Sequence, residues 1–128
     1  MSDYTLKNLK DLENSAERFG LGDAFEARFG RNALELQQFG FSYQKFGPNF
    51  RLPFGHAHRE QEEVYLVVGG SGRAKVEDEI VELKQWDALR IGPGTRRALE
   101  AGADGLEFIA IGGNPTGDAD VVENWWTD

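Results

Sequence analysis

The chain has 128 residues, a length that predicts a single domain with one core. Acidic residues outnumber basic ones by 22 to 14, and this excess disfavours binding to nucleic acid or to an anionic membrane surface. The sequence has no cysteine, which excludes disulfides, thiolate catalysis and zinc–thiolate sites. No apolar run approaches the roughly 20 residues of a membrane helix, and the charged N-terminus does not resemble a signal peptide, so we expect a cytoplasmic protein.

Residues 1–35 are expected to form an N-terminal arm with one short helix. Between Leu9 and Phe19, apolar residues recur at steps of three and four, which is the spacing of one helix face. Gly20 and Gly22 follow directly and end the pattern.

Alternation of apolar and polar residues dominates residues 36–112 and indicates short β-strands. Turn signals recur about every ten residues, a spacing that predicts an antiparallel sandwich or barrel. Residues 64–68 are apolar at every position, so we expect a central strand covered on both faces. Residues 113–128 are expected to form a C-terminal tail, which contains the adjacent pair Trp125-Trp126. Two exposed tryptophans would form an apolar patch, so we expect this tail to pack on the barrel or on a partner subunit.

The two histidines of the chain, His56 and His58, are separated by one residue, which places them on one face of a strand. Residues 59–61 are polar and suit a turn, and if the strand that follows pairs antiparallel with the first, Glu63 lies opposite the histidines. Two imidazoles and a carboxylate suit Fe, Mn, Ni or Zn, with open positions for a substrate. The alternative is a hydrogen-bonded histidine pair at the surface, with Glu63 and its neighbour Glu62 as solvated charges; Glu62 is also a substitute ligand.

These residues resemble a known family. The histidine pair, Glu63 and Gly70 match the second half of cupin motif 1, H-x-H-(x)3–4-E-(x)6-G, and residues 87–95 resemble cupin motif 2. The resemblance covers residues 36–112. It implies an all-β fold, the small antiparallel barrel known as a jelly roll or double-stranded β-helix, with the site inside.

Five positions depart from the cupin motifs, and one of them is Gly92, which stands where motif 2 usually has proline. Phe50 and Trp86 stand where the two motifs open with glycine, and Ala101 stands where motif 2 closes with asparagine. The motif 2 histidine, usually the remaining metal ligand, is Arg97. Three of four ligand positions are kept, so two alternatives stay open: a divalent transition metal or a metal-free barrel.

Arg97 and Tyr65 are the expected substrate-binding residues. An arginine cannot ligate a metal, but it can clamp a carboxylate through two hydrogen bonds if Glu63 stays on the metal. If Arg97 instead pairs with Glu63, the carboxylate is withdrawn and the barrel is metal-free; a third alternative turns Arg97 into solvent. Tyr65 shares a strand face with Glu63, where it is either a pocket hydroxyl or a core aromatic.

Two functions follow from these alternatives, and no catalytic residue is assigned. The first is a metal-dependent enzyme of the oxygenase, isomerase or decarboxylase type that acts on a small organic acid. The second is a metal-free module that binds or senses a small anion. Fingerprints for nucleotide binding and for a Ser-His-Asp triad are absent. We also expect a homodimer, because Val64, Leu66 and Val68 form an apolar face that needs cover, and small cupins commonly pair through such faces.

Overall fold

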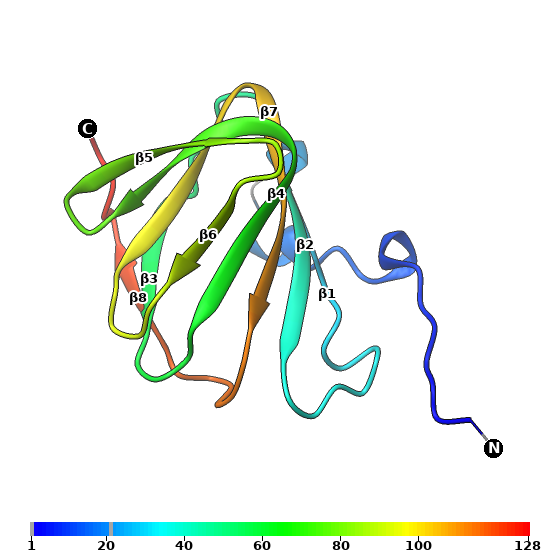
Figure 1. The fold of residues 1–128 in the computed structure, drawn as a ribbon. Helices are drawn as coiled ribbons and strands as arrows, with labels where there is room; N and C mark the ends of the chain where they lie inside the picture. Colours follow the sequence, from blue (N-terminus) through cyan, green and yellow to red (C-terminus); the bar gives the residue numbers. More distant parts are fainter. Residues whose placement is uncertain (1, 21) are drawn as a thin grey trace.

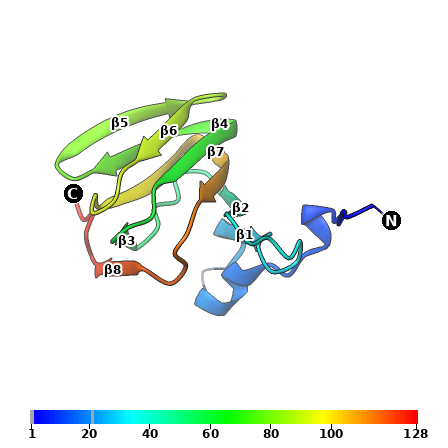
Figure 2. The ribbon, with the colours of Figure 1, turned by 60° about the horizontal axis from the view of Figure 1, so that its bottom comes forward.

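The computed structural model describes residues 2–20 and 22–128, and it consists mainly of one antiparallel sheet that curls on itself (Figures 1 and 2). The strands are β1 (Phe25–Phe29), β2 (Gly40–Phe46), β3 (Phe54–His58), β4 (Glu63–Val76), β5 (Glu79–Lys84), β6 (Ala88–Ile91), β7 (Arg97–Gly112) and β8 (Ala119–Glu123). Three short 3-10 helices precede them: η1 (Leu9–Asp11), η2 (Ser15–Phe19) and η3 (Gly22–Ala24). The all-β jelly-roll prediction is therefore confirmed.

The two longest strands, β4 and β7, pair with each other and connect the parts of the sheet. Strands run in the order β1-β2-β7-β3-β8, and β4 pairs with β7 on one edge and with β5 and β6 on the other. The β4–β7 register shifts near Gly70, where the backbone has φ +69 and an added Cβ would lie 2.1 Å from the carbonyl oxygen of Gly105. Only glycine fits so close an approach, which explains the glycine that closes motif 1.

The core lies on the inner face of the curled sheet. Alternate residues of β4 and β7, among them Tyr65, Val67 and Phe108, point inward and are buried. Phe108 packs edge-on against Phe46 at 5.3 Å and against Tyr65 at 5.6 Å between ring centroids. Each such side chain contributes about 1.5–3 kcal/mol by leaving water.

Residues 64–68 form a central strand segment, as expected, but in a single chain they are not covered on both faces. Tyr65 and Val67 are buried inside, whereas Val64, Leu66 and Val68 are only partly buried. The neighbours β6 and β7 flank this segment within the sheet and therefore do not cover its outer face.

The helical N-terminal arm is confirmed, as separate 3-10 turns rather than one continuous helix. Asn14 separates η1 from η2: its Oδ1 accepts hydrogen bonds from the backbone N–H of Ala16 and, at 2.9 Å, of Ala27 in β1. This side-chain bond caps η2 and ties the arm to the sheet. No helix among residues 2–20 and 22–128 is long and apolar enough to cross a membrane.

The C-terminal segment packs on the sheet. Strand β8 pairs with β3, and Trp126 is buried beneath the guanidinium groups of Arg51 and Arg73, which lie 4.2 and 5.3 Å from its ring centroid. Arg51 also bonds to the carbonyl oxygens of Trp126 and Asp128. Arg51 thus holds the C-terminus in place.

Candidate functional site

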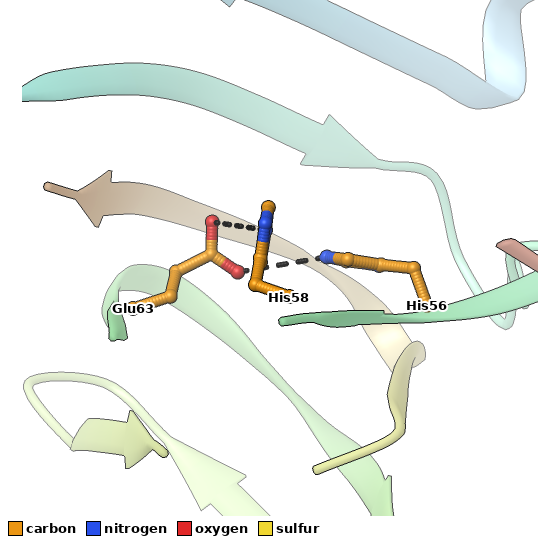
Figure 3. Close-up of side chains that lie close together, drawn as sticks. All are labelled: His56, His58 and Glu63. Carbon is orange, nitrogen blue, oxygen red and sulfur yellow. Dashed lines mark ion pairs between the residues drawn. The ribbon is translucent and has the colours of Figure 1, made fainter. Parts of the chain in front are cut away.

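His56 and His58 of β3 and Glu63 of β4 point toward one another (Figure 3). Their nearest ligand atoms lie within 4.8 Å of one another. The Nε2 of His56 is 3.6 Å from Glu63 Oε1, and the Nε2 of His58 is 3.9 Å from Glu63 Oε2. The two imidazole rings are perpendicular, with centroids 5.1 Å apart.

The three side chains meet although their strands do not pair, so the condition of a hairpin between β3 and β4 is not met. Strand β3 pairs with β7 and β8, whereas β4 pairs with β5, β6 and β7. Glu62 is not a substitute ligand, because it points outward, is exposed and forms an ion pair with Arg90. Successive strand residues face opposite sides, so only Glu63 can reach the interior.

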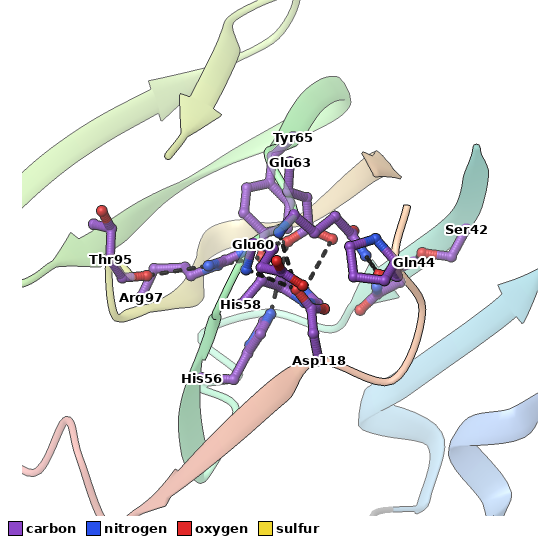
Figure 4. Close-up of polar contacts among 12 residues, drawn as sticks. Ser42, Gln44, His56, His58, Glu60, Glu63, Tyr65, Thr95, Arg97 and Asp118 are labelled. Carbon is purple, nitrogen blue, oxygen red and sulfur yellow. Dashed lines mark hydrogen bonds and ion pairs between the residues drawn. The ribbon is translucent and has the colours of Figure 1, made fainter. Parts of the chain in front are cut away.

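Arg97, in the motif 2 histidine position, points inward and is fully buried (Figure 4). It lies opposite His56 where β7 pairs with β3. Its Nη2 donates to Glu63 Oε1 at 2.5 Å and its Nη1 donates to the carbonyl of Thr95 at 3.1 Å. Its Nε donates to the hydroxyl of Tyr65 at 3.2 Å. All three guanidinium nitrogens are therefore engaged within the protein.

The hydrogen bonds around Glu63 keep it ionised. Burial alone would raise the pKa of Glu63, but hydrogen bonds from His56, Tyr65 and Arg97, together with the positive charge of Arg97, lower the pKa to about 2. Burial and the neighbouring Glu63 charge raise the pKa of the Tyr65 phenol, which stays protonated. The centre thus holds a permanent anion beside a permanent cation.

Asp118 belongs to the same network, although the sequence patterns did not indicate it. Its Oδ1 lies 2.7 Å from His58 Nδ1, and its Oδ2 accepts the backbone N–H groups of Glu60 and Gln61 at 3.0 and 2.9 Å. Burial would raise the pKa of this carboxyl, but these hydrogen bonds hold it well below its ordinary value. An ionised Asp118 favours the tautomer of His58 that carries its proton on Nδ1. The Nε2 atom of His58 then has a free lone pair, and this nitrogen faces Glu63.

A cavity of about 280 Å³ opens beside this cluster. Its polar end is formed by Ser42, Gln44 and the His56–His58–Glu63 group, and Tyr65 also contributes to its wall. Its remaining walls are mainly apolar and include Phe25, Phe29, Phe46, Leu52, Phe54, Leu99 and Phe108. Arg97 does not line this cavity, because it lies behind Glu63.

The donor atoms suit a divalent metal. Two imidazole nitrogens and a carboxylate form a facial set that leaves positions open for other ligands. Glu63 Oε1 bonds to Arg97, but a carboxylate has a second oxygen with its own lone pairs, and Oε2 faces His58. The cluster can therefore hold a metal without breaking the ion pair.

Similarity to known proteins was found only by comparison of three-dimensional structures. No family profile matches the sequence, and no curated protein matches it. Among solved structures, a cupin protein from Bacteroides fragilis is 23% identical over 91% of this chain and 89% of its own, with a TM-score of 0.74. A double-stranded β-helix protein from Klebsiella pneumoniae is 14% identical over 94% and 99% of the two chains, with a TM-score of 0.71.

Oxalate decarboxylase from Bacillus subtilis is 18% identical over 91% of this chain, with a TM-score of 0.72, although the match covers only 32% of the decarboxylase. These likenesses agree with the curled antiparallel sheet. The chain therefore has the cupin fold.

Proposed function

We propose that the protein is a metal-dependent enzyme that acts on a small organic acid, with His56, His58 and Glu63 as the ligands of a divalent transition metal. One observation carries the proposal: the ligand atoms of these side chains converge at the polar end of an otherwise apolar cavity. Such a metal supplies Lewis-acid chemistry, which polarises a carbonyl or carboxylate oxygen.

The chain's own residues prepare the centre in three ways. Asp118 orients His58 through Nδ1, so that Nε2 faces the cavity end. Arg97 fixes Glu63 through Oε1 and leaves Oε2 for coordination. The phenylalanine-lined walls suit an apolar part of the substrate.

Oxygenation, isomerisation and decarboxylation are the reaction types that we propose for this centre. An oxalate decarboxylase is among the structures of the same fold, and its name describes a reaction of a small organic acid. A fold hosts many chemistries, so this likeness supports only the class of substrate.

A second candidate function is supported by the buried Arg97–Glu63 pair. If a divalent metal were bound about 5 Å from the guanidinium of Arg97, the two positive groups would repel each other. At an effective dielectric constant of about 20 this repulsion is about 7 kcal/mol, before the negative charge of Glu63 offsets part of it. This repulsion favours a metal-free barrel that binds or senses a small anion without catalysis. Tyr65 would then form part of the pocket wall and Arg97 would support it from behind, since Arg97 itself does not line the cavity.

Metal titration separates the two functions. We expect chelator-treated wild type to bind one equivalent of at least one of Fe(II), Mn(II), Ni(II) and Zn(II) in calorimetry, and His58→Ala to lose this binding. Glu62→Gln is the matched control, because Glu62 is exposed and faces away from the centre. Wild-type protein that binds none of the four metals contradicts the metal-dependent enzyme and supports the anion-binding module.

A further inference from the structure

A second cavity of about 320 Å³ adjoins the polar cluster. It shares the walls Phe29, Ser42, His58 and Glu63 with the apolar cavity. Arg31, in the loop between β1 and β2, also lines this second cavity. His58 and Glu63 thus stand between an apolar chamber and one that contains an arginine.

Arg31 differs from every other arginine in the chain. Eight of the nine arginines form an ion pair with an aspartate or glutamate, and Arg31 is the exception among residues 2–20 and 22–128. Its Nη2 donates only to neutral oxygens, the carbonyl of Gln37 at 3.2 Å and Oδ1 of Asn114 at 2.5 Å. Arg31 is thus an arginine without an acidic partner in a chain that has 22 acidic residues.

The acids that line the two hollows beside Arg31 already have partners. Glu63 is bound by Arg97. Glu13, which lines an adjoining surface hollow together with Arg31, accepts two hydrogen bonds from Arg18 at 2.8 and 3.0 Å. The positive charge of Arg31 therefore has no compensating carboxylate among the described side chains around either hollow.

We propose that Arg31 binds the carboxylate of the ligand at the entrance to the site, while the apolar part of the ligand extends past His58 and Glu63 into the phenylalanine-lined cavity. The ligand class is thus a monocarboxylate with an alkyl or aryl body. A planar guanidinium matches a carboxylate through paired hydrogen bonds, and the two cavities together have the volume of a small-molecule site.

This inference depends on the proposed function in one respect only, namely that the bound acid then reacts at the metal centre. Binding at Arg31 requires no metal, because Arg31 is not among the three candidate ligands. The position is also distinct from Arg97, whose nitrogens are all engaged inside the barrel.

The test uses acids paired with their neutral amides: phenylacetate with phenylacetamide, and hexanoate with hexanamide. Calorimetric or NMR titrations compare wild type, Arg31→Gln and Arg31→Lys. We expect wild type to prefer at least one carboxylate over its amide about tenfold or more. Arg31→Gln should lose this preference with little change for the amide, and Arg31→Lys should retain part of it.

Arg90→Gln is the matched control, because it removes the same charge from an exposed arginine that lines neither cavity. Thermal unfolding without ligand verifies the fold of each variant, and Arg31→Lys carries the test if Arg31→Gln does not fold. Wild type that prefers neither carboxylate, or an Arg31→Gln variant that binds both acids like wild type, overturns the inference.

Metal titration of the same proteins distinguishes this failure from failure of the proposed function. If the protein binds metal but shows no preference for carboxylates, the inference about Arg31 is wrong and the proposed metal centre stands. Carboxylate binding that depends on Arg31, in protein that takes up no metal, supports the inference and contradicts the metal-dependent enzyme.

Discussion

Arg97 and Glu63 form an ion pair shielded from solvent, and each partner depends on the other. Glu63→Gln removes the negative charge but leaves Arg97 buried with its positive charge. Because an uncompensated buried charge is costly, we expect this substitution to lower the free energy of unfolding by about 3–5 kcal/mol. Urea denaturation measures the loss.

The double variant Glu63→Gln/Arg97→Met is the control for this prediction. It removes both charges, and replacing a whole buried pair by apolar groups is often close to neutral. We therefore expect it to be more stable than Glu63→Gln alone. A single variant as stable as wild type would contradict a stabilising role for the Glu63 charge.

The low pKa of Glu63 also predicts how stability depends on pH. The carboxyl ionises at about 2 in the folded protein and at 4.5 in the unfolded chain. The difference contributes about 3 kcal/mol of stability above pH 4.5, and this contribution disappears as the pH falls from about 4.5 towards 2. We expect the stability gap between wild type and Glu63→Gln to narrow between pH 5 and pH 3. A gap that stays constant in urea titrations contradicts the assigned pKa.

Residue spacing was enough to indicate His56, His58 and Glu63, because their positions within two strands determine which way they point. Asp118 could not be found in this way. It lies far from His58 in the chain, and it reaches the imidazole in a fold where β8 pairs with β3. The sequence did not decide whether the Arg97 side chain points into the barrel or into solvent. In the structure it points inward, where its three hydrogen bonds stabilise it.

At the scale of elements, the turn between β5 and β6 contains a strained residue. Trp86 has φ +75, a conformation that favours glycine, and its side chain is 69% exposed. A left-handed non-glycine residue costs about 1–2 kcal/mol, whereas the extra freedom of glycine in the unfolded chain costs about 0.4–1 kcal/mol. We therefore expect Trp86→Gly to raise the free energy of unfolding by up to about 1 kcal/mol in urea denaturation.

Trp86→Ala is the matched control, because it removes the indole but keeps the Cβ that causes the strain. We expect Trp86→Gly to be the more stable of the two variants. Equal stability would show that this turn relaxes without glycine. The result bears on the motif 2 comparison, since Trp86 occupies the position where that motif opens with glycine.

Alternation along the chain predicted segments of β2, β4 and β7, but it could not predict which strands pair. A turn-like polar stretch between residues 58 and 63 suggested a hairpin, yet β3 and β4 pair with β7 on its two edges and not with each other. Local sequence describes a strand's two faces, whereas pairing depends on the long β4–β7 ladder that organises the sheet. The 3-10 turns of the arm likewise depend on Asn14 and its bond to β1.

At the scale of the whole molecule, the sheet has one apolar outer face that remains incompletely covered. Val64 and Leu66 of β4 stand opposite Ile111 and Ile109 of β7 in the sheet register, and Ile111 is 37% exposed. These neighbours extend the apolar face across two strands. Such a face is typical of protein–protein contacts.

We predict that this face forms the interface of a homodimer. Light scattering at micromolar concentration should give about twice the 14.3 kDa mass of one chain.

A specific interface generally buries about 1,000 Å² or more, and a charge at its centre is strongly unfavourable because it loses its hydration. Leu66→Glu should therefore give a monomer. Val121→Glu is the control, because Val121 is an exposed apolar residue on β8, away from this face, and it should remain dimeric. Circular dichroism checks that both variants keep the β-sheet spectrum, and wild type that scatters as a 14.3 kDa particle contradicts the dimer.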